Sequence, residues 1–84
     1  MKFDCVLIRD GSGYSALCLN VNVSSRGETP AKTKRALKDA VDEYLVDAAK
    51  NNRTYVRPVP KTEDPRTRNP ELIVTNYKIG VDSP

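Results

Sequence analysis

Apolar residues form three short blocks near the start of the chain and one near its end. Between them, apolar residues recur at the spacing of an α-helix. The blocks at residues 2–10 and 13–20 flank the turn sequence Asp-Gly-Ser-Gly, whose glycines supply positive φ angles. This pattern predicts a β-hairpin. A shorter block at residues 21–25 and a β-branched, aromatic-rich block at residues 71–80 predict a third and a fourth strand.

An amphipathic helix is predicted over about residues 29–50. Thr29 suits the N-cap position, and Pro30 suits the first helical position, where its missing N–H costs nothing. Asn51 and Asn52 offer a C-cap. The side chains expected on one apolar face, at the spacing of a helix, are the methyl of Thr33 and those of Ala36, Leu37, Ala40, Val41, Tyr44, Leu45 and Ala48.

The predicted hairpin is apolar on both faces. With Gly11 and Ser12 as turn residues, Cys5 lies directly opposite Cys18. We interpret the two cysteines as buried, reduced thiols; a cross-strand disulfide is the alternative, disfavoured in a reducing cytosol. Because one helix covers only one face of the hairpin, we expect the other to be covered by a later segment or by a second copy.

Residues 53–70 contain four prolines and few apolar side chains. This composition predicts an extended connection, with a short strand at residues 55–57. Such a connection allows the last strand to return parallel to the first through a right-handed crossover. The sequence therefore predicts one α+β domain over residues 1–84, with β-β-β-α-β order and a mixed sheet in the order 3-2-1-4 carrying the helix on one face.

The composition argues against several common kinds of catalytic and metal site. The chain has 84 residues, no histidine, two cysteines and a net charge of +3. Lack of histidine removes the commonest general base, and two cysteines are too few for a zinc site or a disulfide framework. We therefore assign no catalytic residue, no metal ligand and no cofactor. The chain has no apolar run of membrane-spanning length and no secretory pattern at its start, so we expect a cytoplasmic protein without a membrane partner.

Three short motifs accompany this order of elements: Tyr14-x-Ala16, Ser25-x-Gly27-x-Thr29 and Ala40-x-x-x-Tyr44-Leu45. Together they resemble the HicB-like antitoxin family. The resemblance implies a partial RNase H fold, with three antiparallel strands, a helix and a parallel fourth strand. It also implies a non-enzymatic antitoxin of a type II toxin–antitoxin system, which binds and neutralises a small HicA-like ribonuclease that cleaves mRNA. Many members add a DNA-binding module, which we do not expect here.

An RNase H-type nuclease needs several carboxylates that converge on two metal ions. We expect the acids of this chain to be solvated instead, since those on the predicted helix fall on its polar side. The candidates considered are Asp4, Asp10, Asp39, Glu43 and Asp82.

The predicted helix carries bases in its first turns and acids later, the reverse of what its macrodipole favours. The basic residues at this end are Arg26, Lys32, Lys34 and Arg35. We interpret them either as an ordinary solvated face or as a patch for nucleic acid or another anion, which is the alternative function. For protein binding, the candidate residues are Tyr55, Arg57, Tyr77, Asp10 and Ser12. The two-faced hairpin favours a homodimer or higher oligomer.

Overall fold

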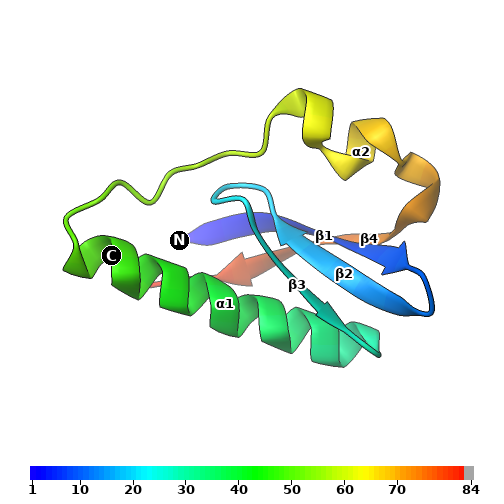
Figure 1. Ribbon diagram of the computed structural model, residues 1–84, viewed down its shortest axis with the longest axis horizontal. Coiled ribbons are helices and arrows are strands. Elements are labelled where there is room, and N and C mark those ends of the chain that lie inside the picture. The colour runs from blue at the N-terminus through cyan, green and yellow to red at the C-terminus, as the bar shows by residue number, and fades with distance from the viewer. Residues whose placement is uncertain (83–84) are drawn as a thin grey trace.

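The computed structural model describes residues 1–82 as a sheet between two unequal layers (Figure 1). The helix α1 lies on one face, and the segment that joins α1 to the last strand lies on the other. The strands are in the order β3-β2-β1-β4, so the α+β class, the strand order and the single main helix are confirmed. The elements are β1 (Lys2–Asp10), β2 (Gly13–Cys18), β3 (Val23–Gly27), α1 (Pro30–Lys50) and β4 (Ile73–Gly80).

The β1–β2 hairpin has the predicted register, with Cys5 opposite Cys18. Gly11 has a φ of 62°, the value that a tight two-residue turn requires at its first position. β2 ends two residues earlier than predicted and β3 begins two residues later. The reason is a turn at residues 19–22, in which the Asn22 N–H donates to the Cys18 carbonyl at 2.9 Å.

The helix begins and ends as predicted. The Thr29 hydroxyl oxygen accepts from the Lys32 N–H at 3.1 Å, and Pro30 occupies the first turn. At the other end, the Asn51 N–H donates to the Asp47 carbonyl. No helix within residues 1–82 is long and apolar enough to cross a membrane. The helix residues that are buried against the sheet are Thr33, Leu37, Val41, Leu45 and Ala48.

A close approach fixes the start of α1 against the end of β3. A Cβ atom added to Gly27 would lie 2.6 Å from the Thr33 hydroxyl and 2.9 Å from the Thr33 backbone nitrogen. Thr33 is itself fully buried, and its hydroxyl donates to the Thr29 carbonyl at 2.6 Å. The spacing of Gly27 and Thr29 in the sequence is therefore explained by packing, because only glycine leaves room for the first turn of the helix.

The last strand runs antiparallel to β1, so the predicted parallel pairing and the mixed sheet are wrong. Ile79 lies opposite Phe3, and Tyr77 lies opposite Cys5. Beyond β4, the Val81 N–H donates to the Met1 carbonyl at 2.9 Å. The parallel fourth strand implied by the resemblance to HicB-like antitoxins is thus absent.

The path of the connecting segment explains this reversal. A parallel β4 would have to begin at the end of the sheet where α1 ends. Instead, residues 51–72 travel the length of the sheet on its second face and reach the hairpin end before β4 begins (Figure 1). From there the strand can only run back against β1.

The connecting segment is also more ordered than predicted. Residues 55–57 form no strand, although the Arg57 and Val59 N–H groups donate to the carbonyls of Asn20 and Leu19 at 3.1 and 2.9 Å. The extended path then gives way to three short helices, η1 (Lys61–Glu63), α2 (Pro65–Arg68) and η2 (Pro70–Leu72). Two of the prolines that suggested an extended chain stand at helix starts, where proline is well tolerated.

This segment covers the second apolar face of the hairpin. Val6, which points away from α1, is 0% exposed, and Leu19 is 9% exposed. Asp64 holds the segment in shape, because its buried carboxylate accepts from the Arg66 N–H at 2.9 Å and pairs with the Arg66 guanidinium at 2.7 Å. These contacts with Arg66 lower the pKa of Asp64. The cover required by the two-faced hairpin therefore comes from within the chain.

Replacing Gly27 by alanine should lower the free energy of unfolding by about 1–3 kcal/mol, because the new methyl group overlaps the backbone of Thr33. Urea denaturation followed by circular dichroism measures the change. Gly80→Ala is the matched control, since nothing lies within 4 Å of its added Cβ atom. Its effect should stay within about 0.5 kcal/mol, and equal losses in both variants would contradict the packing argument.

Asp64→Asn should lower the free energy of unfolding by about 1 kcal/mol at neutral pH, because it weakens the cap of α2 and removes the ion pair with Arg66. The pKa of Asp64 is lowered in the folded state, so this stabilisation is full above the ordinary aspartate pKa. It is lost as the pH falls through the folded value. Denaturation at pH 7 and pH 3 should show that the difference in free energy of unfolding between wild type and variant is smaller at pH 3. Glu63→Gln, at an exposed neighbour, should show no such gap.

Candidate functional site

Arg57, predicted to bind a partner, is exposed and also makes contacts within the chain. Its guanidinium donates to the carbonyls of Val21 and Asn22 at 3.0 and 3.1 Å. The same group lies 4.9 Å from the centre of the Tyr44 ring. These contacts fasten the connecting segment to the turn between β2 and β3 and to α1. Arg57 therefore has a structural role and remains a candidate for partner binding.

The two tyrosines among the predicted partner residues are also engaged within the chain. Tyr55 stacks on Phe3 with ring centres 6.3 Å apart. Tyr77 lies opposite Cys5 and is half-buried, with the Lys34 ammonium 4.7 Å from its ring centre. The structure therefore uses both rings to close the core at β1 and β4.

The predicted residues of the hairpin turn lie at the far end of the sheet from Tyr55. Asp10 accepts from the Ser15 hydroxyl at 2.5 Å and pairs with Arg26 at 3.0 Å. Ser12 is exposed and lines a shallow hollow of about 310 Å³ together with Gly13 and Arg26. The partner residues predicted from sequence thus do not form one surface.

The basic residues near the start of α1 have separate surroundings. Arg26 pairs with Asp10 at the end of β3, and Lys34 lies over the ring of Tyr77. Lys32 and Arg35 are exposed on the first turns of α1. Two of the four cations are therefore already in contact with groups of this chain.

The acids considered for nuclease chemistry stand apart from one another. Asp4 pairs with Lys78, while Asp39 and Glu43 are exposed on α1. Within residues 1–82 no group of three or more His, Cys, Asp or Glu residues is placed to hold a metal ion.

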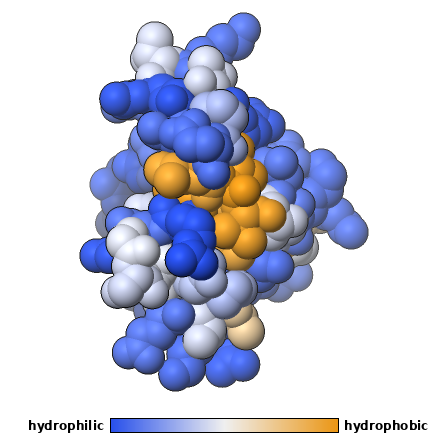
Figure 2. All heavy atoms as spheres, turned by 90° about the vertical axis from the view of Figure 1, so that its right-hand side faces the viewer, coloured by the Kyte–Doolittle hydropathy of each residue, from blue (hydrophilic) through white to orange (hydrophobic). Residues whose placement is uncertain are grey.

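An apolar surface that sequence reasoning missed lies where β4 begins. Ile73 pairs with Ile8 across the sheet. Leu72 is 38% exposed and Val74 45% exposed, while the other members are half-buried. Figure 2 faces this end of the molecule and shows one continuous apolar area within a polar surround. We call this surface the edge patch, and it consists of Ile8, Leu17, Leu72, Ile73 and Val74.

The edge patch adjoins an unpaired strand edge. β4 stands at the end of the sheet order and, within residues 1–82, pairs only with β1. It is 8 residues long, against 5 for β3 at the opposite edge, and β3 is backed closely by α1. The backbone N–H and C=O groups on the outer side of β4 are therefore available to a further strand.

The run Leu72-Ile73-Val74 was visible in the sequence, but its position depended on the direction of β4. With the predicted parallel pairing, this run would lie beside the start of β1 and far from Ile8. The antiparallel pairing places it next to Ile8 and thereby joins two apolar groups into one patch.

No family model, no curated protein and no solved structure matches the chain.

Arg57→Ala should lower the free energy of unfolding by about 1 kcal/mol, because two hydrogen bonds and the contact with Tyr44 are lost. Arg57→Lys should recover little, since an ammonium cannot reproduce the forked donation to two carbonyls. Chemical denaturation measures both variants. Arg68→Ala, which removes an exposed arginine from the same segment, is the control and should leave stability unchanged. Unchanged stability of Arg57→Ala would contradict this structural role.

Proposed function

We propose that this chain is a non-enzymatic protein-binding module that receives its partner on the edge patch and the free edge of β4. We further propose that the partner is a small HicA-like ribonuclease toxin, which the chain neutralises as a HicB-like antitoxin. The observation that carries the first proposal is the coincidence of an exposed apolar surface with the open outer edge of β4. The three sequence motifs alone support the second.

The edge patch has the features of a protein contact surface. Leu72 and Val74 are exposed beside Ile8 and Leu17, which are only half-buried, so the apolar area is larger than a scattered surface residue presents. A partner strand placed along β4 would gain main-chain hydrogen bonds from the edge and apolar contact from the patch. This combination is the usual basis of recognition by strand addition.

Charge supports the apolar mode of binding. The chain has a net charge of +3, so it attracts a basic partner poorly at long range. Lys78, on β4, already pairs with Asp4. Binding at the edge patch would depend mainly on apolar and main-chain contacts, so its affinity should change little with salt.

The assignment to an antitoxin rests on the motifs that the sequence shares with the family. Gly27 and Thr29 have structural roles at the start of α1, and Tyr44 donates its hydroxyl hydrogen to the Tyr55 carbonyl at 2.9 Å. These positions serve the fold, whereas the antiparallel β4 departs from the family's parallel strand. The toxin is consequently the part of the proposal that most needs a direct experiment.

The test uses a small HicA-like ribonuclease, purified with and without this chain. Wild type should form a stable complex at micromolar concentration and stop cleavage of mRNA. Leu72→Ser/Val74→Ser should weaken binding by at least about tenfold, because it removes the exposed part of the edge patch. Isothermal titration calorimetry and an RNA-cleavage assay give the two readouts.

The matched control is Val46→Ser/Val56→Ser, which removes two exposed valines, 66% and 59% exposed, outside the patch. It should bind as wild type does. Equal losses in the two double variants would contradict the edge patch, and separate elution of chain and ribonuclease would contradict the antitoxin. Light scattering of the chain alone completes the test: a dimer that Leu72→Ser/Val74→Ser dissociates would identify a second copy as the occupant instead.

A further inference from the structure

The two cysteines occupy one rung of the β1–β2 ladder, and neighbouring hydrogen bonds define the type of that rung. Cys5 lies directly opposite Cys18. On the next rung, the Leu19 N–H donates to the Asp4 carbonyl at 2.8 Å. Because hydrogen-bonded and non-hydrogen-bonded pairs alternate along antiparallel strands, Cys5 and Cys18 form a non-hydrogen-bonded pair.

This rung suits a covalent link. Cα atoms in a non-hydrogen-bonded pair lie about 4.5 Å apart, and their side chains leave the sheet on the same face. Disulfides join Cα atoms that are about 4.4–6.8 Å apart. The backbone around Cys5 and Cys18 therefore needs no large movement to accept a bond between the two sulfurs.

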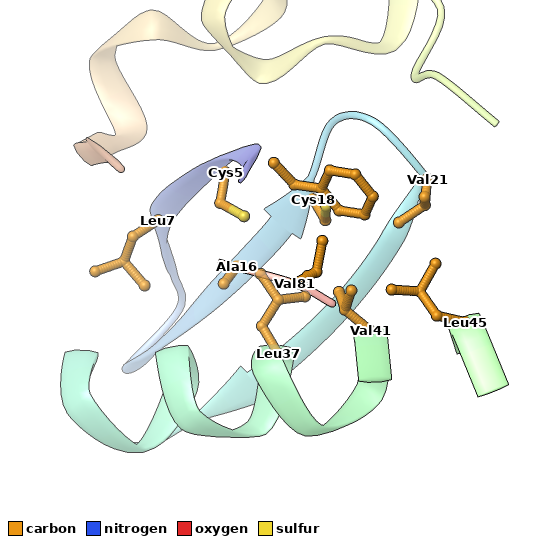
Figure 3. Close-up of a cluster of buried hydrophobic side chains, with 10 residues drawn as sticks. Cys5, Leu7, Ala16, Cys18, Val21, Leu37, Val41, Leu45 and Val81 are labelled. Atoms are coloured by element: carbon orange, nitrogen blue, oxygen red, sulfur yellow. The ribbon is translucent and has the colours of Figure 1, made fainter. Parts of the chain in front are cut away.

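Both thiols are free and enclosed in the core between the sheet and α1. Cys5 is 1% exposed and Cys18 is 0% exposed. Figure 3 shows the two side chains together among the core residues above α1. Tyr77 lies opposite Cys5 on β4, and its buried hydroxyl has no hydrogen-bond partner within residues 1–82. Burial raises the pKa of Tyr77, so this hydroxyl stays protonated as a donor beside the sulfurs.

The two thiols differ in acidity. A hydrogen bond from Cys5 lowers the pKa of Cys18 to about 7. The same hydrogen bond and burial raise the pKa of Cys5, which keeps its proton. The contact between the two thiols therefore favours loss of one proton from the pair, with the lower pKa on Cys18.

Small molecules have a short route to this pair. Cys5 lies next to β4, which is an edge strand and therefore opens more readily than a central one. A peroxide molecule is little larger than water, so a brief opening of β4 suffices to admit it.

We propose that Cys5 and Cys18 are a reversible modification site, at which a peroxide oxidises the pair to a cross-strand disulfide that ties β1 to β2. Cys18 loses its proton, and its thiolate attacks one peroxide oxygen. The O–O bond breaks, a sulfenic acid forms on Cys18, and the departing hydroxide takes up the proton that Cys18 released and leaves as water. The Cys5 sulfur then attacks the Cys18 sulfur, and the S–O bond breaks. The released hydroxide leaves as water with the Cys5 proton. In sum, two thiols and one hydrogen peroxide give one disulfide and two waters.

The first experiment treats the reduced full-length chain with hydrogen peroxide. Its intact mass should fall by two hydrogen atoms, both thiols should disappear in the denatured protein, and a peptide map should join Cys5 to Cys18. Dithiothreitol should restore both thiols. The melting temperature of the oxidised form should be about 10 °C higher, because the link reduces the conformational entropy of the unfolded chain. Thiols that persist, oxygen added without a link, or a link between two chains would overturn the proposal.

A second experiment distinguishes the two sulfurs with a sulfenic acid trap. In Cys5→Ser, the serine hydroxyl still offers Cys18 a hydrogen bond, so peroxide should give a trapped adduct. Cys18→Ser leaves only the less acidic Cys5 and should react at least about tenfold more slowly. Trapping in wild type under limiting peroxide needs no variant and should label Cys18 first. Equal labelling of both cysteines would overturn the order of attack. Neither experiment involves the toxin, so their outcome is independent of the proposed function.

Discussion

The central hairpin is apolar on both faces, and the placement of the other elements follows from the need to cover it. α1 covers one face, with Leu37 and Val41 fully buried against it. The other face needs a second layer, because Val6 alternates with Cys5 and Leu7, which pack toward α1, and is fully buried. The segment between α1 and β4 supplies that layer and must run the length of the sheet to do so. The direction of β4, its pairing with β1 and the position of the edge patch are consequences of this single path.

The sequence contained most of the local structure. Thr29, Pro30 and the helical spacing of Leu37, Val41 and Leu45 placed α1, and Gly11 placed the hairpin turn with the correct register. These signals are local, because caps, turns and periodicity depend on neighbours in the chain. The direction of β4 depended instead on where residues 51–72 run, which no local signal determines. The edge patch was missed for the same reason. Leu72 and Val74 are evident apolar residues in the sequence, but their position in the fold depends on the direction of β4.

The reversed charge order of α1 is explained in part by contacts across its surface. Lys34 lies over the Tyr77 ring, which is half-buried on β4. Lys38 pairs with Asp42 at 2.7 Å one turn later, and Arg53 pairs with Asp47 beyond the end of the helix. Each exposed pair contributes a few tenths of a kcal/mol. This is the same order as the cost of placing a charge unfavourably in the helix macrodipole, so the pairs offset that cost in part. The exposed cations Lys32 and Arg35 have no such structural explanation.

The antiparallel return of β4 also brings the two ends of the described chain together, with the Val81 N–H on the Met1 carbonyl. The edge patch lies at the opposite end of the same strands, where Ile8 meets Ile73. A protein joined at Met1 or directly after Val81 would therefore emerge at one common point, remote from the apolar surface. A direct peptide link between the ends, with a new opening at the Gly11 turn, would keep every strand in place. The fold thus separates the site where the chain can be extended from the surface where we propose that it binds.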